Sequence, residues 1–191
     1  MLTSLIQHIQ EYVPVSDALQ QRLEEISVYK VVEEGKFLHR PHKVCENTYF
    51  INSGLMRVFY KKDDKEITDT FASEGEWITS VYSFMRNIPD HFYIQTLEKT
   101  ELVSINLFQL EKCFADFHEM ERFGRMLVSR YFVEHSERAL AFKFHSAKEK
   151  YRYFCVTSKN IVSRVPLGML ASYLGITQET LSRIRADRSA F

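Results

Sequence analysis

The sequence predicts an α+β protein, and two patterns support that fold class. Apolar residues recur every three or four positions before Ser27 and after Ile105, which is the spacing of helices. Between residues 28 and 105, short runs of β-branched and aromatic residues alternate with turns that contain Gly, Asn and Asp. Many short strands joined by tight turns are typical of a jelly-roll-like, double-stranded β-roll. We therefore expect helices at both ends of the chain and a β-roll between them.

Two short helices are expected before the β-roll. Residues 2–13 carry apolar side chains on one helical face, and Pro14 ends or bends that helix because proline lacks the backbone N–H group. Ser16 can cap a second helix over residues 17–27. The expected strands span residues 28–32, 37–38, 48–51, 55–60, 67–71, 93–97 and 101–105. Residues 72–88 are expected to be irregular.

After Phe117 the sequence predicts one long helix that runs to about Phe144. Two rows of apolar or charged residues recur every seven positions along it. The first row is Phe123, Arg130, Glu137 and Phe144, and the second is Met126, Val133 and Leu140. This a/d arrangement is typical of a two-stranded coiled coil, so we expect a homodimer. The alternative is that the helix packs only against its own β-roll, because Arg130 and Glu137 interrupt the seam.

The C-terminal part predicts three further helices. Ser146 can cap a helix over residues 148–158. Residues 165–185 then read as two short helices, with Gly175 as the positive-φ residue of the turn and Thr177 as the next N-cap. The expected apolar core of this pair is Leu170, Leu174, Ile176, Leu181 and Ile184, with small Ala171 at the crossing. This pattern is typical of a DNA-binding helix-turn-helix, although a short helical hairpin in another fold is the alternative.

The charge distribution agrees with DNA binding confined to the C-terminal part. The 191 residues contain 25 Lys or Arg and 25 Asp or Glu, so the net charge is zero. From Arg138 to the end, ten basic residues face three acidic ones, which gives +7 and leaves −7 for the first 137 residues. A basic region attracts the phosphates of nucleic acids. The alternative is that these basic residues only solvate helix faces.

Several classes of protein are disfavoured by the sequence. The chain has no run of eighteen apolar residues and no signal-peptide pattern, so we expect a cytoplasmic protein without a membrane span. Cys45, Cys113 and Cys155 are widely spaced, which favours reduced, structural cysteines. His39 and His42 share a loop and are expected at the surface rather than as metal ligands. The sequence shows neither a nucleophile–base spacing nor a phosphate-binding loop, so we expect neither an enzyme nor a cofactor.

The order of parts resembles the Crp/Fnr superfamily of bacterial transcription regulators, over nearly the whole chain. The residues that carry the resemblance are Gly35, residues 49–54 (Y-F-I-N-S-G), Met56-Arg57-Val58, the Gly75-Glu76 pair and residues 170–184. The ending L-G-I-T-Q-E-T-L-S-R-I-R is most similar to a branch common in Bacteroidetes. Only six residues follow Arg185, so the β-hairpin wing that follows the helix-turn-helix in many members is expected to be reduced or absent.

The resemblance implies a division into three parts. Residues 1–117 would form a cyclic-nucleotide-binding-like sensor domain, residues 118–145 a dimerisation helix, and residues 146–191 a helix-turn-helix domain. The implied function is a homodimeric, sequence-specific transcription regulator that binds a pseudo-palindromic site on double-stranded DNA, with RNA polymerase as a possible further partner. The alternative is a signalling or interaction module whose helix-turn-helix binds a protein.

Family positions and base chemistry together give the candidate DNA contacts. Gln178, Glu179 and Arg183 match the positions that face base edges, and these side chains can pair with adenine, cytosine and guanine respectively. Alternatively, Glu179 only supports the start of its helix or orients Arg183. Thr177, Ser182 and Arg185 are better placed for phosphates. Without a wing, further phosphate contacts are expected from Lys148, Lys150, Arg152 or Arg164.

The resemblance also implies an effector pocket in the β-roll. Its expected residues are Gly75, Glu76, Trp77, Ser80, Tyr93 and Gln95, although a tryptophan such as Trp77 is more often a core residue than a ligand platform. Nucleotide-binding relatives hold the cyclic phosphate with an arginine, and the corresponding position here falls near Asp90 or His91. Arg86 lies nearby, in a variable loop. Because an aspartate repels a phosphate, we expect cyclic AMP to bind weakly or not at all, and the effector is unknown.

Overall fold

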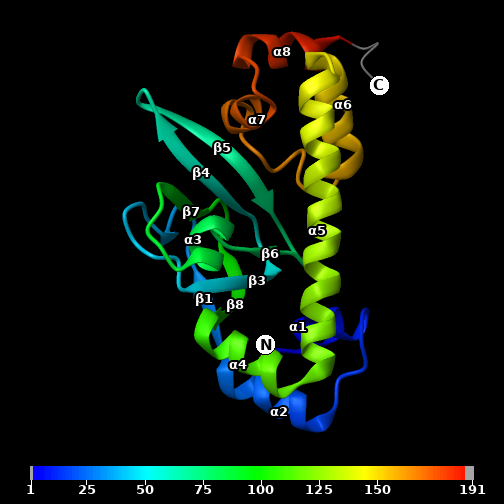
Figure 1. The fold of residues 1–191 in the computed structure, drawn as a ribbon. Coiled ribbons are helices and arrows are strands. Elements are labelled where there is room, and N and C mark those ends of the chain that lie inside the picture. The colour runs from blue at the N-terminus through cyan, green and yellow to red at the C-terminus, as the bar shows by residue number, and fades with distance from the viewer. Residues whose placement is uncertain (1, 188–191) are drawn as a thin grey trace. The chain divides into compact units, whose positions relative to one another are not determined.

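The structure is a computed structural model that describes residues 2–187 (Figure 1). The chain forms two compact units, and each is built from two separate segments. Unit 1 comprises the N-terminal residues up to Val58 together with Phe71–Ser129. Unit 2 comprises Phe59–Thr70 together with the residues from Arg130 onward. The predicted boundaries at residues 117 and 145 stay a prediction, because compact packing and functional division need not coincide.

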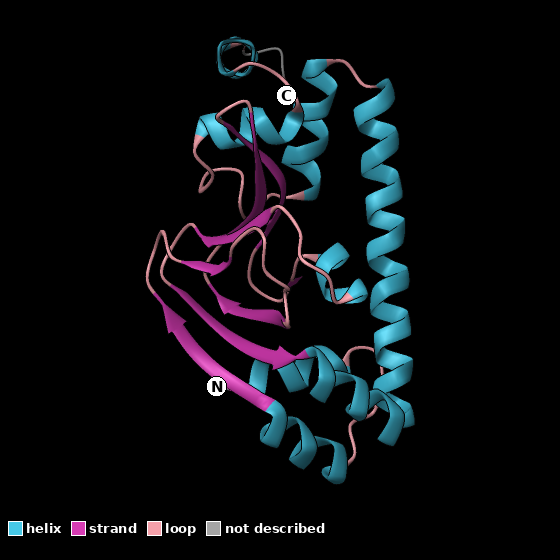
Figure 2. Ribbon diagram, turned by 60° about the vertical axis from the view of Figure 1, so that its left-hand side comes forward, coloured by secondary structure: helices cyan, strands magenta, loops and turns pink. Residues whose placement is uncertain are grey.

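The β-roll consists of two four-stranded sheets, with strand orders β1-β8-β3-β6 and β2-β7-β4-β5. Its strands are β1 (Ser27–Val32), β2 (Phe37–His39), β3 (Asn47–Ser53), β4 (Met56–Lys62), β5 (Lys65–Ala72), β6 (Trp77–Ile78), β7 (Phe92–Thr96) and β8 (Thr100–Asn106). In the first sheet β8 pairs antiparallel with both β1 and β3, and β3 pairs antiparallel with β6. Figure 2 distinguishes these strands from the helices. The predicted α+β class is confirmed.

The β-roll is preceded by α1 (Thr3–Gln10) and α2 (Asp17–Ile26) and followed by α4 (Leu107–Asp116) and α5 (His118–Phe144). Two of these four helices, α2 and α4, begin at residues whose side chains cap them. Ser16 Oγ accepts a hydrogen bond from Leu19 N at 3.3 Å, as its position before α2 predicted. Asn106 Oδ1 caps α4 by accepting from Phe108 N at 3.0 Å. These bonds satisfy N–H groups that a helix start otherwise leaves without a partner.

The expectation that residues 72–88 are irregular was wrong. This stretch contains β6 and a short helix, α3 (Val81–Arg86), which ends where Asn87 adopts a left-handed φ of 54°. The exposed side chains of α3 include Val81 and Met85, whereas Ser83 is buried. Most apolar residues of this six-residue helix lie outside, and the polar Ser83 is buried beside Phe84, so the helix lacks the usual amphipathic pattern and periodicity could not indicate it.

Unit 1 has two clusters of buried apolar side chains. The first joins α1, α2, α4 and the start of α5 to the outer face of a sheet, and its members Ile9, Leu23 and Phe50 are fully or almost fully buried. The second lies between the two sheets and includes Ile51 and Leu102. Burying one side chain of this size stabilises the fold by about 1.5–3 kcal/mol. The two clusters hold the β-roll and its helices together.

Unit 2 contains the C-terminal part of α5 and three more helices, α6 (Ala147–Thr157), α7 (Leu167–Leu174) and α8 (Gln178–Ala186). Its second segment is the hairpin of residues 59–70, which forms most of β4 and β5. The predicted break between α5 and α6 is confirmed by a capping box, in which Ser146 N donates to Glu149 Oε2 at 2.7 Å and Ser146 Oγ accepts from Glu149 N.

Near the N-terminus of α5, the residue predicted to face a dimer partner is instead buried in its own unit. Phe123, expected in a row that faces a partner, is 1% exposed and packs with Met120 inside unit 1. A seven-residue period cannot tell two apolar surfaces apart, which is why the prediction at Phe123 was wrong. Val133, Leu140 and Phe144 are exposed by 55%, 58% and 75%. No helix among residues 2–187 is long and apolar enough to cross a membrane.

Candidate functional site

The turn between α7 and α8 has the geometry that its sequence predicted. Gly175 lies in the left-handed region with φ of 66°, and its N–H donates to Ser172 O at 3.2 Å. Ile176 N then donates to Ala171 O at 3.0 Å, so that two of the last four carbonyls of α7 have partners. Thr177 Oγ1 accepts from Thr180 N at 3.1 Å and thereby caps α8.

Helix α8 is held by one face only. Leu181 is fully buried against a core that includes Leu170, Ala171 and Leu174, and Ile184 is half-buried. The opposite face is polar and exposed. With Leu167, it lines an open hollow of about 640 Å³ whose other residues are Gln178, Glu179, Ser182 and Arg183. The structure therefore brings these four predicted DNA-contacting residues onto one accessible surface, with exposed Thr177 at the start of the helix and exposed Arg185 near its end.

Two details of this surface bear on its chemistry. A Cβ atom on Gly168 would lie 3.1 Å from Gln178 Oε1, so the glycine leaves room for Gln178 beside α7. Among residues 2–187, Glu179 and Arg183 form no ion pair with each other or with another side chain. Both charged groups are thus available to a ligand. The roles proposed for them from the sequence stay predictions.

Several of the basic residues predicted to make additional phosphate contacts already interact with other groups in unit 2. Lys148 Nζ lies 3.0 Å from Asp187 Oδ2, so an ion pair offsets its charge and joins the start of α6 to the end of α8. Lys150 Nζ lies 5.5 Å from the centre of the Phe142 ring. Arg164 Nη1 donates to Asn160 O at 3.5 Å. These contacts reduce what Lys148 can offer to a phosphate and leave α8 as the main candidate surface.

Helix α7 is fixed to the hairpin of residues 59–70 by hydrogen bonds that the sequence did not indicate. Ser172 Oγ accepts from Thr68 N at 3.2 Å and donates to Thr68 Oγ1 at 3.1 Å. Arg138 Nη1, from α5, donates to Asp69 O and Thr70 Oγ1, both at 3.3 Å. Thr68 lies 104 residues before Ser172, beyond the reach of any local pattern, whereas the other partner of Ser172 Oγ, Met169 O, lies in its own helix at 2.8 Å.

The first three predicted effector-site residues lie around the turn before β6. Gly75 has φ of 79° and open space where a side chain would be. Glu76 Oε2 accepts from Ser73 N at 2.6 Å, so this carboxylate closes its own turn. The Trp77 ring centre lies 5.3 Å from that of Phe50, in the first core cluster. Trp77 therefore packs as the core alternative expected.

The other three predicted effector-site residues have partners elsewhere in the β-roll. Gln95 Oε1 accepts from Arg57 Nε at 3.0 Å and from Arg57 Nη2 at 2.7 Å, and Arg57 is 2% exposed. The Tyr93 ring centre lies 5.7 Å from that of Phe37. Ser80 donates to Asp90 Oδ2. These contacts tie the three side chains to different neighbours, and the effector pocket as a set stays a prediction.

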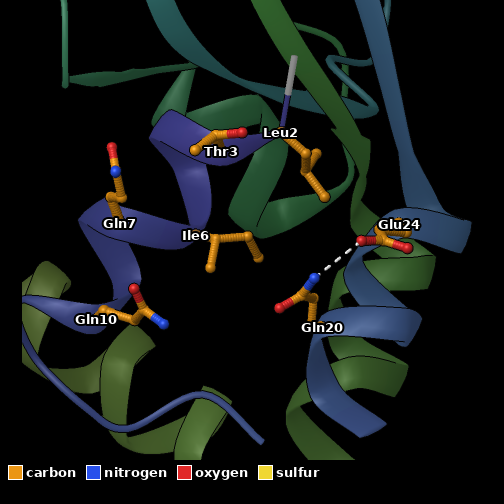
Figure 3. A pocket seen from close by; sticks show the side chains of 7 residues that line it. All are labelled: Leu2, Thr3, Ile6, Gln7, Gln10, Gln20 and Glu24. Carbon is orange, nitrogen blue, oxygen red and sulfur yellow. Dashed lines mark hydrogen bonds between the residues drawn. The ribbon is translucent and has the colours of Figure 1, made fainter. Parts of the chain in front are cut away.

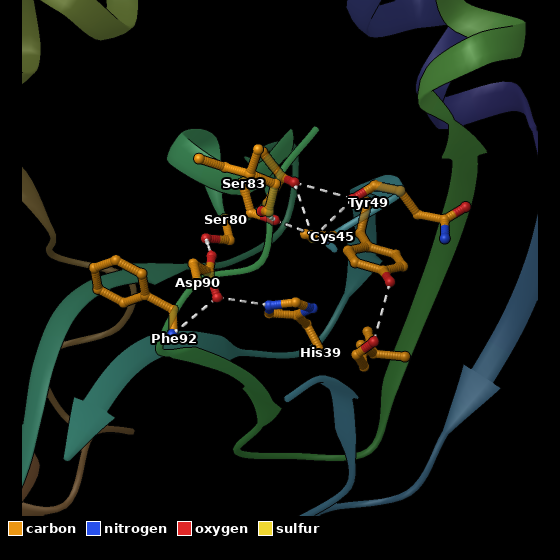
Figure 4. Close-up of polar contacts among 11 residues, drawn as sticks. His39, Cys45, Tyr49, Ser80, Ser83, Asp90 and Phe92 are labelled. Atoms are coloured by element: carbon orange, nitrogen blue, oxygen red, sulfur yellow. Dashed lines mark hydrogen bonds and ion pairs between the residues drawn. The ribbon is translucent and has the colours of Figure 1, made fainter. Parts of the chain in front are cut away.

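Asp90 occupies the region where the resemblance placed a phosphate-binding arginine, and its side chain is fully buried (Figure 4). Besides Ser80, the carboxylate accepts from Phe92 N at 3.0 Å and pairs with His39 Nε2 at 2.9 Å. His39 was expected at the surface, and that expectation was wrong because its ring is buried against Asp90. A buried carboxylate needs such partners, since an unpaired one is costly.

Comparison with known proteins agrees with this architecture. Residues 29–117 match the family model described as "Cyclic nucleotide-binding domain". This segment is therefore similar to that family.

Solved structures extend the likeness to the fold of the whole chain. FixK2 from Bradyrhizobium japonicum matches with a TM-score of 0.73 at 14% identity, over 84% of this chain and 83% of that one. A CooA mutant from Carboxydothermus hydrogenoformans gives 0.71 at 15% identity, over 96% and 84%. A regulator of the Crp/Fnr family from Eubacterium rectale gives 0.69 at 18%, over 91% and 85%. No curated protein matches the chain. The chain thus has the Crp/Fnr fold.

Within residues 29–117, Cys45 lies beside the Asp90–His39 pair (Figure 4). Cys45 N donates to Ser83 Oγ at 2.8 Å, and Sγ lies 3.5 Å from Thr79 Oγ1. Burial raises the pKa of the Cys45 thiol, but hydrogen bonds with His39, Thr79 and the Ser80 backbone outweigh it, so that the net pKa is lowered. Burial lowers the pKa of His39, but its hydrogen bonds with Cys45 and Asp90 outweigh this and raise it overall.

A second hollow, of about 280 Å³, lies outside those residues, between α1 and α2 (Figure 3). Its lining residues are Leu2, Thr3, Ile6, Gln7, Gln10, Gln20 and Glu24. On the α2 side of the hollow, Gln20 Nε2 donates to Glu24 Oε1 at 3.1 Å. This hollow presents amides but no group of metal ligands, and residues 2–187 contain no cluster of three His, Cys, Asp or Glu side chains that could hold a metal ion.

Proposed function

We propose that the protein is a homodimeric, non-enzymatic transcription regulator that binds double-stranded DNA at a specific sequence through α8. The observation that carries this proposal is the exposed polar face of α8, opposite the face that Leu181 buries. A short helix fixed on one side and presenting polar side chains on the other fits the major groove of DNA. The net charge of +7 from Arg138 onward supports an anionic partner.

The exposed side chains of α8 divide by chemistry. Arg183 can donate two parallel hydrogen bonds to guanine, Gln178 can pair with adenine, and Glu179 can accept from the amino group of cytosine. Thr177, Ser182 and Arg185 can donate to phosphates and position the helix without reading sequence. The proposal therefore assigns specificity to the first three and affinity to the other three.

The exposed apolar residues of α5 support a dimer. In unit 2 these are Phe132, Val133, Leu140 and Phe144, all more than half exposed. Apolar side chains in water are stabilised when another apolar surface covers them, and a second copy of the same helix supplies such a surface. Two copies of α8, spaced about 34 Å apart, would then contact successive major grooves and read a pseudo-palindrome.

We also infer that the cyclic nucleotide-binding domain does not take cyclic AMP as its effector. The buried Asp90 carboxylate would repel a cyclic phosphate in the region where a cation is needed. Its hydrogen-bonding capacity is already used by Ser80, Phe92 N and His39. Calorimetric titration with cyclic AMP should give no saturable heat at micromolar ligand. A stoichiometric binding isotherm in that range would contradict this inference.

Selection of bound duplexes from a random DNA pool tests the regulator proposal. We expect a palindromic consensus whose half-sites are about one helical turn apart. Arg183→Ala should relax the preference at one position per half-site, whereas Arg185→Ala removes the same charge from the same helix and should weaken all sequences alike. If no consensus emerges, and the exposed face of α8 binds a protein without salt dependence, the interaction-module alternative replaces the proposal.

A further inference from the structure

We propose that the hairpin of residues 59–70 sets the spacing between the two DNA half-sites that a dimer reads, because it holds the helix-turn-helix to α5 through Ser172 and Arg138. This role rests on the proposed function, since only a protein that binds two half-sites has a spacing to set. All the groups involved lie within unit 2. Ser172 and Arg138 act as positioning residues, and neither contacts the DNA itself.

Ser172 joins α7 to strand β5 of the hairpin (Figure 1). Its Oγ lies 3.2 Å from Thr68 N and 3.1 Å from Thr68 Oγ1. Thr68 is 3% exposed, so Ser172 and not water is the partner of this amide. The same Oγ lies 2.8 Å from Met169 O, which fixes the hydroxyl to the backbone of α7. Hydrogen bonds therefore define the position of α7 along the hairpin.

Helix α8 follows any movement of α7. Leu170 and Leu174 of α7 and Leu181 of α8 are all fully buried. In the turn between the helices, Ile176 N donates to Ala171 O at 3.0 Å. A close-packed core transmits displacements instead of absorbing them, so the two helices move as one body. A change in how α7 meets the hairpin is thus passed on to the exposed face of α8.

Arg138 joins the same hairpin to α5. Its Nη1 donates to Asp69 O and to Thr70 Oγ1, both at 3.3 Å. Its Nη2 lies 3.0 Å from His135 Nδ1, one turn earlier on α5. A guanidinium is planar and rigid, so contacts on two of its nitrogens fix its orientation. The hairpin is therefore held to α5 at the two residues that directly follow Thr68, where it holds α7.

Aromatic packing at Tyr173 holds α5, α6 and α7 in contact but does not fix their register. The ring centre of Tyr173 lies 5.5 Å from that of Phe142 and 5.4 Å from that of Phe154. Ring pairs are favourable over centre distances of about 4.5–7 Å, so these helices can shift and keep the contact. Hydrogen bonds weaken steeply when their angle changes. Orientation thus depends on Ser172 and Arg138 more than on the rings.

Arg138 also lies on the part of α5 that carries the proposed dimer surface. It is placed between Val133 and Leu140, whose side chains are exposed by 55% and 58%. A two-fold dimer that covers these side chains fixes Arg138 relative to its axis and, through the hairpin, fixes α8 as well. One base pair spans about 3.4 Å of the DNA axis. A looser hairpin contact would therefore let the dimer accept half-sites with different spacers.

The test measures binding of the full chain to duplexes that carry the selected half-sites and spacers of different length. Fluorescence anisotropy gives the affinity for the selected spacer and for spacers one base pair shorter and longer. The unchanged protein should prefer the selected spacer by about tenfold, which is within the range for one mismatched base pair. Ser172→Ala should lower this spacer ratio by about two- to tenfold, the factor that corresponds to one lost hydrogen bond.

Ser163→Ala is the matched control. It removes a hydroxyl from an exposed position before α7 and should keep the spacer ratio of the unchanged protein. Arg138→Lys is a second variant, which also serves if Ser172→Ala does not fold. It keeps the positive charge but lacks the guanidinium fork, so it should lower the spacer ratio without changing the salt dependence of binding.

Base preference within a half-site separates positioning from a general loosening of the helix-turn-helix. Ser172→Ala should leave the ranking of single-base changes unaltered, because the side chains on the exposed face of α8 and the core beneath them stay the same. If base preference and spacer ratio fall together, Ser172 supports the helix-turn-helix itself and the positioning role is wrong.

Two further results would overturn the proposal. One is an unaltered spacer ratio in Ser172→Ala or Arg138→Lys when circular dichroism shows an intact fold. The other is an unchanged protein that binds its half-sites equally well at every spacer length. Both differ from a failure of the proposed function, in which the unchanged protein selects no consensus half-site and no spacing exists to be set.

Discussion

On α8, the polar side chains of Gln178, Glu179 and Arg183 face solvent, whereas around Asp90 nearly every polar group faces another protein group. The first set is held in place by apolar residues beneath it, and the second set holds itself together. Removing an exposed polar group leaves nothing uncompensated, while removing a buried one leaves its partners without hydrogen bonds. The two regions should therefore respond oppositely to mutation, one in binding and the other in stability.

Asp90→Ala should give the largest loss of stability, about 4 kcal/mol, because it leaves His39 and Ser80 buried without their partner. Urea denaturation followed by circular dichroism measures this change. Glu111→Ala, which removes an exposed carboxylate on α4, is the control and should stay within about 0.5 kcal/mol. A loss below about 1 kcal/mol for Asp90→Ala would show that the buried network does not hold itself together as described.

Leu181→Ala should cost about 3 kcal/mol, since it opens a cavity in the small core beneath α8. The same variant should also weaken DNA binding, because the exposed face of α8 depends on this anchor for its orientation. Thermal unfolding and gel-shift titration measure the two effects. Ser182→Ala on the exposed face is the control for stability, and a similar loss there would contradict the one-sided anchoring of the helix.

Arg183→Ala should leave stability unchanged and weaken binding to the selected DNA by about 2 kcal/mol. Fluorescence anisotropy with the consensus duplex and with a scrambled duplex gives the affinity and the specificity together. Asp90→Asn, assayed where it remains folded, should keep the specificity. If the variant Arg183→Ala keeps its selectivity for the consensus duplex, Arg183 does not contact the bases, and the proposed difference between the two regions does not hold for this residue.

Ser172→Ala should have the smallest effect, a loss of about 1 kcal/mol, because it removes one hydroxyl that bonds Thr68 at both N and Oγ1. Ser163→Ala, at an exposed position before α7, is the matched control. Hydrogen exchange at Thr68 N is the sharpest measurement, since this amide loses its acceptor directly. Unaltered protection there would mean that the hairpin is held by other contacts.

The same contrast explains how much could be predicted from the sequence. The turn at Gly175, the N-cap at Thr177 and the buried Leu181 follow from local spacing, because each interacts within a few residues. The cap at Ser16 and the capping box at Ser146 follow for the same reason. Local chemistry was therefore sufficient for the helix starts and for the residues exposed on α8.

The residues that were missed depend on distant partners. His39 and Asp90 are 51 positions apart, and nothing near His39 in the sequence indicates burial. Phe123 was assigned to a partner-facing row because periodicity does not say which apolar surface a side chain meets. The sequence showed only that Asp90 lies near the position where the family resemblance led us to expect an arginine. The burial of its carboxylate and its pairing with His39 became visible only in the structure.

The division of the chain limits how unit 2 can be separated from the remainder. The chain passes between the two units three times, after Val58, after Thr70 and after Ser129. A fragment that begins at Arg130 would carry α6 to α8 but would lack Thr68, Asp69 and Thr70, the hydrogen-bonding partners of Ser172 and Arg138. Gene fusion or recombination at a single junction would therefore transfer an incomplete unit. Grafting this part onto another protein requires the hairpin as well as the C-terminal helices.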